Sequence, residues 1–170
     1  MNKSTETLLY YENNAESFAD TTVGVDMRDL YSRFLKELPE GGYILDFGCG
    51  SGRDTKAFLK KGYRMDAIDG SEELCKKASA FTGIPVKCML FQELAAAKIY
   101  DGVWACASIL HLPKKELANV LCKIAAALKQ NGVFYTSFKY GVFEGMRNGR
   151  YFTDFTEISL QEFWERNVPL

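Results

Sequence analysis

The chain has 170 residues, 47% of them hydrophobic and 25% charged, and a formal net charge of −1 at pH 7. This length and balance suit one domain with an apolar core over residues 1–170, and the near-neutral charge gives no field that would attract a nucleic acid. No apolar run approaches the roughly 20 residues that cross a bilayer, and the N-terminal stretch is polar and acidic after Lys3, unlike a signal peptide, so we expect a cytoplasmic protein without membrane contacts.

Helical and strand patterns alternate from residue 25 to residue 138. Apolar residues such as Met27, Leu30 and Phe34 recur at the spacing of one helical face, and "PEGG" at 39–42 ends that helix. The predicted helices cover residues 25–38, 52–61, 71–81, 113–129 and 159–167, and the predicted strands cover 43–47, 63–69, 86–91, 101–108 and 133–138. The alternation predicts a parallel sheet with helices on both faces, which binds ligands at the carboxyl ends of its strands.

The cysteines and the histidine argue against a metal site. Five cysteines are spread through apolar segments without a CxxC pair, at positions 49, 75, 88, 106 and 122. With a single histidine in the chain, we interpret them as reduced core thiols and expect no metal.

Three alternating glycines, Gly48, Gly50 and Gly52, follow the predicted strand 43–47 and precede a predicted helix. Such a turn lets the backbone approach a nucleotide-like ligand closely. Arg53 stands where the dinucleotide fingerprint GxGxxG has its third glycine, and the carboxylate of Asp46 would oppose a pyrophosphate. The same carboxylate would favour an ammonium or sulfonium group.

A second acid, Asp69, ends the next predicted strand, 21 residues beyond Gly48, and is followed by Gly70 and Ser71. A carboxylate at this point can accept hydrogen bonds from both hydroxyls of a ribose. It therefore suits any ligand that contains adenosine.

The segments "ILDFGCGSG", "AIDGS", "YDGVWACASILHLP" and "ALKQNGVFYTSFKYG" together resemble the successive motifs of class I S-adenosylmethionine-dependent methyltransferases. The resemblance covers roughly residues 10–165, and within this superfamily it is strongest to the small bacterial tellurite-resistance-type group. It implies a Rossmann-like sheet of strand order 3-2-1-4-5, S-adenosylmethionine as cofactor, S-adenosylhomocysteine as product, and an N-terminal cap over residues 1–24.

The resemblance also implies the residues that hold the cofactor. The third strand of such enzymes usually ends in an aspartate near the adenine, whereas Gln92 stands there in this chain. The implied cofactor-binding residues are Tyr11, Asp46, Gly48, Cys49, Gly50, Arg53, Asp54, Asp69, Gly70, Ser71, Phe91, Gln92, Ala105 and Cys106.

The acceptor side of the site is less defined. His111 is a candidate general base for methyl transfer, or else a structural residue that caps the helix starting at Pro113. Residues 139–157 mix basic, aromatic and glycine residues like a lid. Its Lys139, Arg147 and Arg150, with Tyr10 from the N-terminal segment, suit a small, anionic acceptor.

Two alternative functions stay open: a S-adenosylmethionine-binding module without turnover, and a nicotinamide-dependent oxidoreductase, which Asp46 and Arg53 disfavour. The sequence after Phe138 is too short for the two further strands that end most class I methyltransferases, so we expect five parallel strands. The fifth strand, with "VFYTSF", would then be an apolar edge strand. We expect either residues 139–157 or, in a homodimer, a second subunit to cover it.

Overall fold

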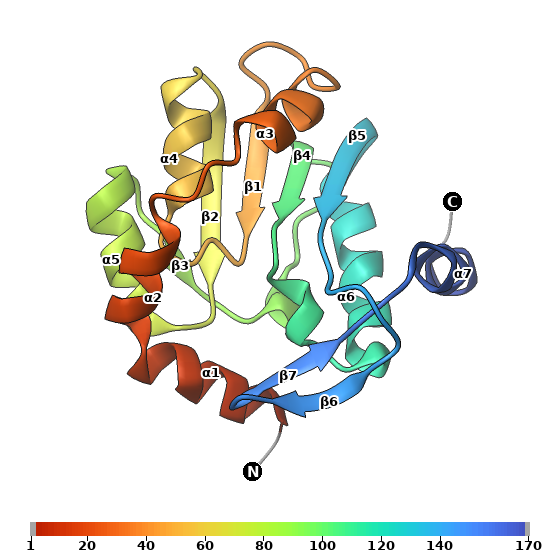
Figure 1. Ribbon diagram of the computed structural model, residues 1–170. Helices are drawn as coiled ribbons and strands as arrows, with labels where there is room; N and C mark the ends of the chain where they lie inside the picture. The colour runs from red at the N-terminus through yellow and green to blue at the C-terminus, as the bar shows by residue number, and fades with distance from the viewer. Residues whose placement is uncertain (1–2, 169–170) are drawn as a thin grey trace.

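The computed structural model describes residues 3–168, which fold around a five-stranded parallel sheet (Figure 1). Its strands are β1 (Tyr43–Phe47), β2 (Arg64–Asp69), β3 (Lys87–Cys88), β4 (Tyr100–Ala105) and β5 (Leu128–Thr136). They lie in the order β3-β2-β1-β4-β5, and every neighbouring pair is parallel. The predicted fold class and strand order are therefore confirmed.

Helices cover both faces of the sheet, which explains why its central strands are mostly apolar. One face packs against α3 (Arg28–Leu35), α4 (Arg53–Lys60) and α5 (Glu72–Thr82), and the other against α6 (Lys114–Ala127). Along β1, Leu45 and Phe47 join the cluster around α6, whereas Ile44 joins the cluster around α3 and α4. Trp104 of β4 lies in that second cluster and is fully buried.

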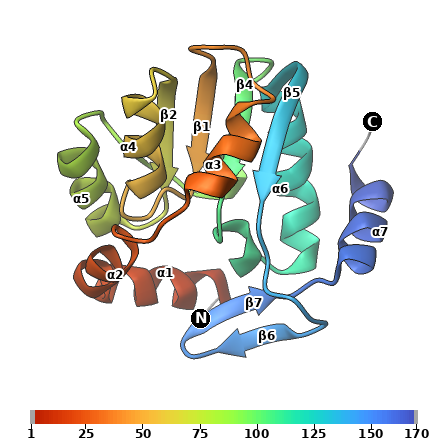
Figure 2. The ribbon, with the colours of Figure 1, turned by 45° about the horizontal axis from the view of Figure 1, so that its top comes forward.

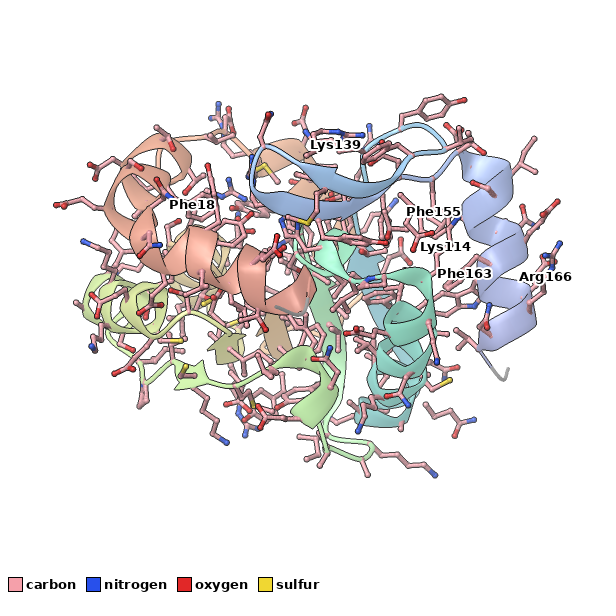
Figure 3. The ribbon with its side chains drawn as sticks, turned by 90° about the horizontal axis from the view of Figure 1, so that it is seen from below. Phe18, Lys114, Lys139, Phe155, Phe163 and Arg166 are labelled. Carbon is pink, nitrogen blue, oxygen red and sulfur yellow. The ribbon has the colours of Figure 1, made fainter. Side chains whose placement is uncertain are left out.

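Two segments from opposite ends of the chain lie across the carboxyl ends of the strands. They are the helices α1 (Lys3–Asn13) and α2 (Ala15–Thr22) and the hairpin of β6 (Glu144–Arg147) and β7 (Arg150–Thr153) (Figure 2). The view onto this end shows the hairpin beside the N-terminal helices, with Phe18 on α2 and Lys139 on the segment that leads into the hairpin (Figure 3). Two short 3₁₀ turns, η1 (Phe91–Glu93) and η2 (Ile109–His111), follow β3 and β4.

The main sheet has five strands, as expected, but two further strands that the sequence analysis did not expect form outside it after Phe138. Residues 139–157 contain two strands of four residues each, which pair with each other and not with the main sheet. The turn between them has positive φ at Asn148 (50°) and Gly149 (77°), which is the geometry that an Asn-Gly hairpin requires. The sequence "RNGR" carried this signal.

The hairpin also lies elsewhere than expected. It packs against α1, where the backbone N–H of Tyr151 donates to Thr7 Oγ1 at 2.9 Å, and it does not lie along β5. The helix α7 (Glu157–Asn167) packs beside α6, and its Trp164 stacks on Phe134 of β5 at 5.8 Å between ring centroids. Within residues 3–168 no strand pairs with the outer edge of β5, and a homodimer through that edge stays a prediction.

Some element boundaries differ from the predicted ones. The third strand shrinks to Lys87–Cys88, and α3 starts at Arg28 and ends at Leu35. β5 begins at Leu128, directly after α6. Within it, Asn131 adopts a positive φ of 63° next to a register shift in the β4–β5 pairing, so the strand continues through an irregular segment. The "NG" at 131–132 thus lies within a strand and does not end the helix. In the described part of the chain, no helix has the length and apolar character needed to cross a bilayer.

Candidate functional site

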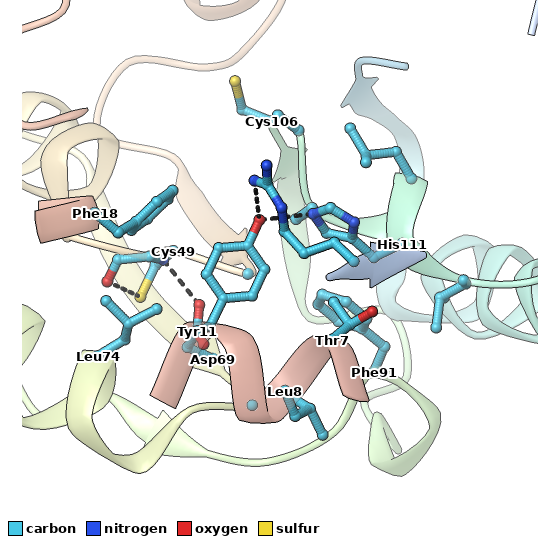
Figure 4. A pocket seen from close by; sticks show the side chains of 18 of the residues that line it. Thr7, Leu8, Tyr11, Phe18, Cys49, Asp69, Leu74, Phe91, Cys106 and His111 are labelled. Atoms are coloured by element: carbon cyan, nitrogen blue, oxygen red, sulfur yellow. Dashed lines mark hydrogen bonds between the residues drawn. The ribbon is translucent and has the colours of Figure 1, made fainter. Parts of the chain in front are cut away.

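A cavity of about 500 Å³ opens at the carboxyl ends of β1, β2 and β4. Its floor consists of the turns that follow these strands, and α1, α2 and the hairpin close it from the other side (Figure 4). This is the edge at which parallel sheets of this type bind ligands.

The glycine turn after β1 forms one wall of this cavity. Gly48 and Gly50 have positive φ values of 85° and 53°. A Cβ on Gly48 would lie 2.4 Å from Cβ of Ser108, and one on Gly50 would lie 2.9 Å from a ring carbon of Phe18. Both conformation and close packing therefore favour glycine at these positions, most strongly at Gly48.

Asp69 brings a carboxylate to the same cavity from the end of β2. Its Oδ2 accepts the backbone N–H of Gly50 and its Oδ1 that of Ser71, each at 2.9 Å. Each carboxylate oxygen has two lone pairs, so one acceptor position on each oxygen is left for a ligand. Burial raises the pKa of this carboxyl. Two acceptor positions side by side match a pair of neighbouring hydroxyls.

Asp46 does not line the cavity, which corrects its predicted place beside a cationic ligand group. The alternation of β1 turns its side chain toward α4, where it is 1% exposed and accepts a hydrogen bond from Thr55 Oγ1 at 2.5 Å. Burial, and then the charge of Asp54, raise the pKa of Asp46 far above its usual range. The charge that the prediction relied on is therefore disfavoured in the folded protein.

Asp54 lines the cavity, but its carboxylate already forms hydrogen bonds to neighbouring side chains. Its carboxylate accepts hydrogen bonds from Tyr31 Oη at 2.5 Å, from Trp104 Nε1 at 2.8 Å and from Arg53 Nε at 2.6 Å. The ion pair neutralises Arg53. These contacts join α3, α4 and β4 beneath the glycine turn.

His111 lies on the cavity wall within a hydrogen-bonded chain (Figure 4). Its Nδ1 is 2.7 Å from the carbonyl oxygen of Tyr151, which can only accept, so Nδ1 carries the proton. Nε2 is then an acceptor for the hydroxyl of Tyr11, also at 2.7 Å. Burial lowers the pKa of His111 to about 4 and raises that of Tyr11, so both side chains are neutral at pH 7.

This geometry excludes helix capping as the role of His111, because both ring nitrogens bond to groups outside α6 and the N-cap position is Pro113.

Two further predicted site residues, Gln92 and Ser71, form hydrogen bonds to acidic side chains of the protein itself. Gln92 lines the cavity but donates to Glu116 Oε2 at 2.6 Å. Ser71 caps α5 and donates to Glu12 of α1 at 2.6 Å, which links the N-terminal helix to the turn that follows Asp69.

The cavity brings most of the predicted site residues together. Those that line it are Tyr11, Gly48, Cys49, Gly50, Arg53, Asp54, Asp69, Gly70, Phe91, Gln92, Cys106, His111, Lys139 and Arg150. Those that lie outside its lining are Tyr10, Asp46, Ser71, Ala105 and Arg147.

Sequence reasoning missed several lining residues. Leu8 and Phe18 come from α1 and α2, Ser108 and Glu116 from around η2 and α6, and Phe152 from the hairpin. The Asn-Gly turn would have located Phe152 on a strand. The other four carry no local signal, because long-range packing alone brings them to the cavity.

A family model for the methyltransferase domain matches residues 44–132, slightly more than half of the chain. The chain belongs to the methyltransferase-domain family. The match runs from β1 to the middle of β5 and so includes the glycine turn, Asp69 and His111.

Two bacterial relatives agree with this methyltransferase domain. The provisionally named methyltransferase YqeM of Bacillus subtilis (strain 168) is 28% identical over 124 residues, which cover 65% of this chain and 50% of YqeM. An uncharacterized methyltransferase of Geobacillus sp. (strain WCH70) is 27% identical over 135 residues, 74% of this chain and 63% of that protein. The chain thus spans between half and two thirds of the length of these relatives.

Solved structures share the fold over nearly the whole chain. The 1,6-didemethyltoxoflavin-N1-methyltransferase of Burkholderia thailandensis, with bound 1,6-didemethyltoxoflavin and S-adenosylhomocysteine, superposes with a TM-score of 0.76 at 23% identity over 98% of this chain and 77% of its own. The magnesium protoporphyrin IX methyltransferase of Synechocystis PCC 6803, with bound S-adenosylmethionine, gives 0.74 at 15% identity over 98% and 86% of the two chains. At these identities the likeness is one of fold.

Proposed function

We propose that the protein is an S-adenosylmethionine-dependent methyltransferase that acts on a small acceptor. The observation that carries the proposal is the pairing of Asp69 with the glycine turn at one cavity wall. Two carboxylate oxygens keep free acceptor positions there, beside a turn whose positive φ values and close packing favour glycine. Membership of the methyltransferase-domain family and the cofactors held by the neighbouring structures support the same cofactor.

The described residues fit this cofactor. Asp69 would accept the two ribose hydroxyls, Gly48 and Gly50 would allow the backbone to approach the methionine part, and Phe91 and Gln92 would border the adenine. When bound, S-adenosylmethionine supplies a methyl group on a sulfonium, whose leaving group is a neutral thioether. The chain's own task is then to align the acceptor and to exclude water, which suits a cavity closed by α1, α2 and the hairpin.

His111 is placed to take a proton from the acceptor. It is neutral at pH 7, and its Nε2 lone pair is directed into the cavity toward Tyr11 Oη. A proton from an acceptor N–H or O–H can reach Nε2 directly if the Tyr11 hydroxyl moves aside, or through that hydroxyl. This feature favours an enzyme over a binding module without turnover.

Two measurements test the proposal. Calorimetry should show micromolar binding of S-adenosylmethionine or S-adenosylhomocysteine, about 8 kcal/mol, without competition from NADH. A screen with methyl-labelled S-adenosylmethionine should then find transfer to a small acceptor, and His111→Ala should reduce that rate about 10²-fold while S-adenosylhomocysteine affinity is kept. Tighter binding of NADH than of S-adenosylmethionine would contradict the cofactor, and binding without any transfer would favour the module.

The narrower resemblance to the tellurite-resistance-type group stays a prediction that the motifs quoted from the sequence support, and the cytoplasmic location stays a prediction as well.

A further inference from the structure

Two arginines of the hairpin have different electrostatic environments. Arg147 of β6 pairs with Asp154, with 2.7 Å between Nη2 and Oδ2, and does not line the cavity. Arg150 of β7 lines the cavity and forms no ion pair with any residue between 3 and 168. One of the two positive charges is therefore neutralised within the hairpin, and the other faces the site.

Aromatic rings hold the Arg150 guanidinium in place. Its central carbon lies 4.6 Å from the ring centroid of Tyr10, 5.3 Å from that of Phe152 and 5.9 Å from that of Tyr11. Such cation–π contacts orient the group but accept none of its N–H bonds in the plane of the guanidinium.

The hydrogen-bonding capacity of Arg150 is almost unused. Nε is buried without a partner, and the hydroxyl of Tyr11 accepts from Nη1 only at 3.5 Å. A guanidinium carries five N–H donors, and a buried donor without an acceptor costs free energy. An anion in the cavity would satisfy these donors through the forked geometry that carboxylates favour.

The other charged groups around the cavity differ from Arg150. Lys139 also lines the cavity and forms no ion pair with any residue between 3 and 168, but it is exposed, whereas Arg150 is partly buried. Arg53, on the opposite wall, is neutralised by Asp54 at 2.6 Å, and Asp69 is held by backbone N–H groups. The surfaces near Arg150 are aromatic, with Phe152 beside it on β7 and the ring of Phe18 5.1 Å from that of Tyr11. A cation set among aromatic rings suits an organic acid with an apolar body better than it suits a free inorganic anion.

We propose that Arg150 binds the carboxylate of the methyl acceptor, and that the acceptor is a small organic acid whose apolar body lies against Phe18 and Phe152. The inference rests on the proposed function and adds the substrate class. It also separates the three basic residues predicted for the acceptor, because Arg147 has no part in it.

The test uses benzoate as the probe, with neutral benzamide and inorganic phosphate as comparisons. The full-length protein, saturated with S-adenosylhomocysteine, is titrated with each probe and binding is followed by NMR. The same titrations are made with Arg150→Gln and with Arg147→Gln as the matched control on the same hairpin. The affinity of each variant for S-adenosylhomocysteine is measured separately by calorimetry.

We expect benzoate to bind at least tenfold more tightly than benzamide or phosphate. Arg150→Gln should weaken benzoate at least tenfold and leave S-adenosylhomocysteine within twofold, and Arg147→Gln should change neither. If Arg150→Gln does not fold, Arg150→Lys replaces it in the test. Lysine keeps the positive charge but lacks the forked donor geometry of the guanidinium, so this variant should weaken benzoate binding at least threefold.

Three results would overturn the inference. They are equal binding of benzoate and benzamide, unchanged benzoate binding in the Arg150 variants, and a tenfold loss of S-adenosylhomocysteine affinity in those variants, which would assign Arg150 to the carboxylate of the cofactor. Failure of the parent protein to bind S-adenosylhomocysteine would instead contradict the proposed function. The benzoate titration of the ligand-free protein would still report on Arg150.

Discussion

Asp46 lies one residue before the end of β1 and Asp69 ends the neighbouring β2, yet they face different environments. The Asp46 side chain points into the helix-covered face and is 1% exposed, whereas Asp69 points along the sheet edge into the cavity. Position along the sheet decides this, because Asp46 pairs with Ala67 of β2, so that Asp69 lies on the same face but two residues nearer the carboxyl edge. Of the two carboxylates, only Asp69 can contact a ligand in the cavity.

Asp69→Asn should lower the affinity for S-adenosylhomocysteine by on the order of 1.5–3 kcal/mol, because the amide keeps the shape but loses the charge that strengthens two hydrogen bonds. Calorimetry measures this change. Asp66→Asn is the matched control, since Asp66 lies on the same strand, accepts from Tyr100 Oη at 2.7 Å and does not line the cavity. Equal affinities for parent and Asp69→Asn would remove Asp69 from the cofactor site.

The single histidine of the chain provides a direct pH probe. The ring of His111 should titrate near pH 4, below its ordinary value of 6.5, because burial disfavours its charged form. Its C–H resonances in NMR would report the midpoint, and a midpoint near 6.5 would contradict the buried Tyr11–His111 pair. Tyr11→Phe is the control, since it keeps the ring and removes the hydroxyl that donates to Nε2.

The lowered pKa of His111 also makes the free energy of unfolding depend on pH. Between pH 6.5 and 4 the unfolded chain binds a proton on this histidine that the folded chain does not, so the stabilising contribution is fully present above pH 6.5 and is lost as the pH falls to about 4. The loss should be on the order of 3 kcal/mol in the free energy of unfolding. Urea unfolding at pH 4.5 and pH 7 measures it, and a His111→Gln variant should lose less over this range.

At the scale of elements, packing between helices restricts the glycine turn. Gly52, at the N-terminus of α4, has φ 80°, and a Cβ there would lie 2.7 Å from Cγ2 of Thr82 on α5. Gly62, at the other end of α4, has φ 87° with open space around it. The two glycines share a backbone conformation and differ in their neighbours.

Gly52→Ala should therefore destabilise the protein more than Gly62→Ala. The left-handed conformation alone costs an alanine about 1–2 kcal/mol, and the contact with α5 should add a further 1 kcal/mol or more at Gly52. Chemical denaturation of the two variants gives both values. Equal destabilisation would mean that α5 moves away freely.

At the scale of the whole molecule, the cavity depends on segments that are far apart in the chain. α1 and β7 meet over it through Thr7 and Tyr151, and Glu12 of α1 accepts a hydrogen bond from Ser71 at the start of α5. These contacts join the N-terminal helix both to the hairpin and to the Asp69 turn. Ligand binding in the cavity should therefore stabilise the folded chain as one unit.

S-adenosylhomocysteine at 100 times its dissociation constant should raise the free energy of unfolding by about 2.7 kcal/mol, since a ligand that binds only the folded state stabilises it by mass action. Thermal or urea unfolding with and without the ligand measures this effect. NADH at the same concentration is the control and should cause no change. Stabilisation by NADH alone would favour an oxidoreductase.

The sequence by itself determined the order of the central elements and brought the glycine turn and Asp69 to one edge of the sheet. The alternating helix and strand patterns, the glycine turn and Asp69 are local features, because period, turn conformation and strand ends are written in consecutive residues. The Asn-Gly turn of the hairpin was equally local and could have been predicted.

Only the tertiary structure decided which side chains meet in the cavity. The orientation of Asp46, the 2.7 Å contact between Tyr11 and His111 across 100 residues, and the pairing of Arg147 but not Arg150 depend on the packing of α1 and the hairpin over the sheet. Such contacts are set by long-range burial and hydrogen-bond satisfaction, which leave no periodic trace in the chain. The acceptor side of the site is built from these contacts, and for that reason it was the part that the sequence defined least.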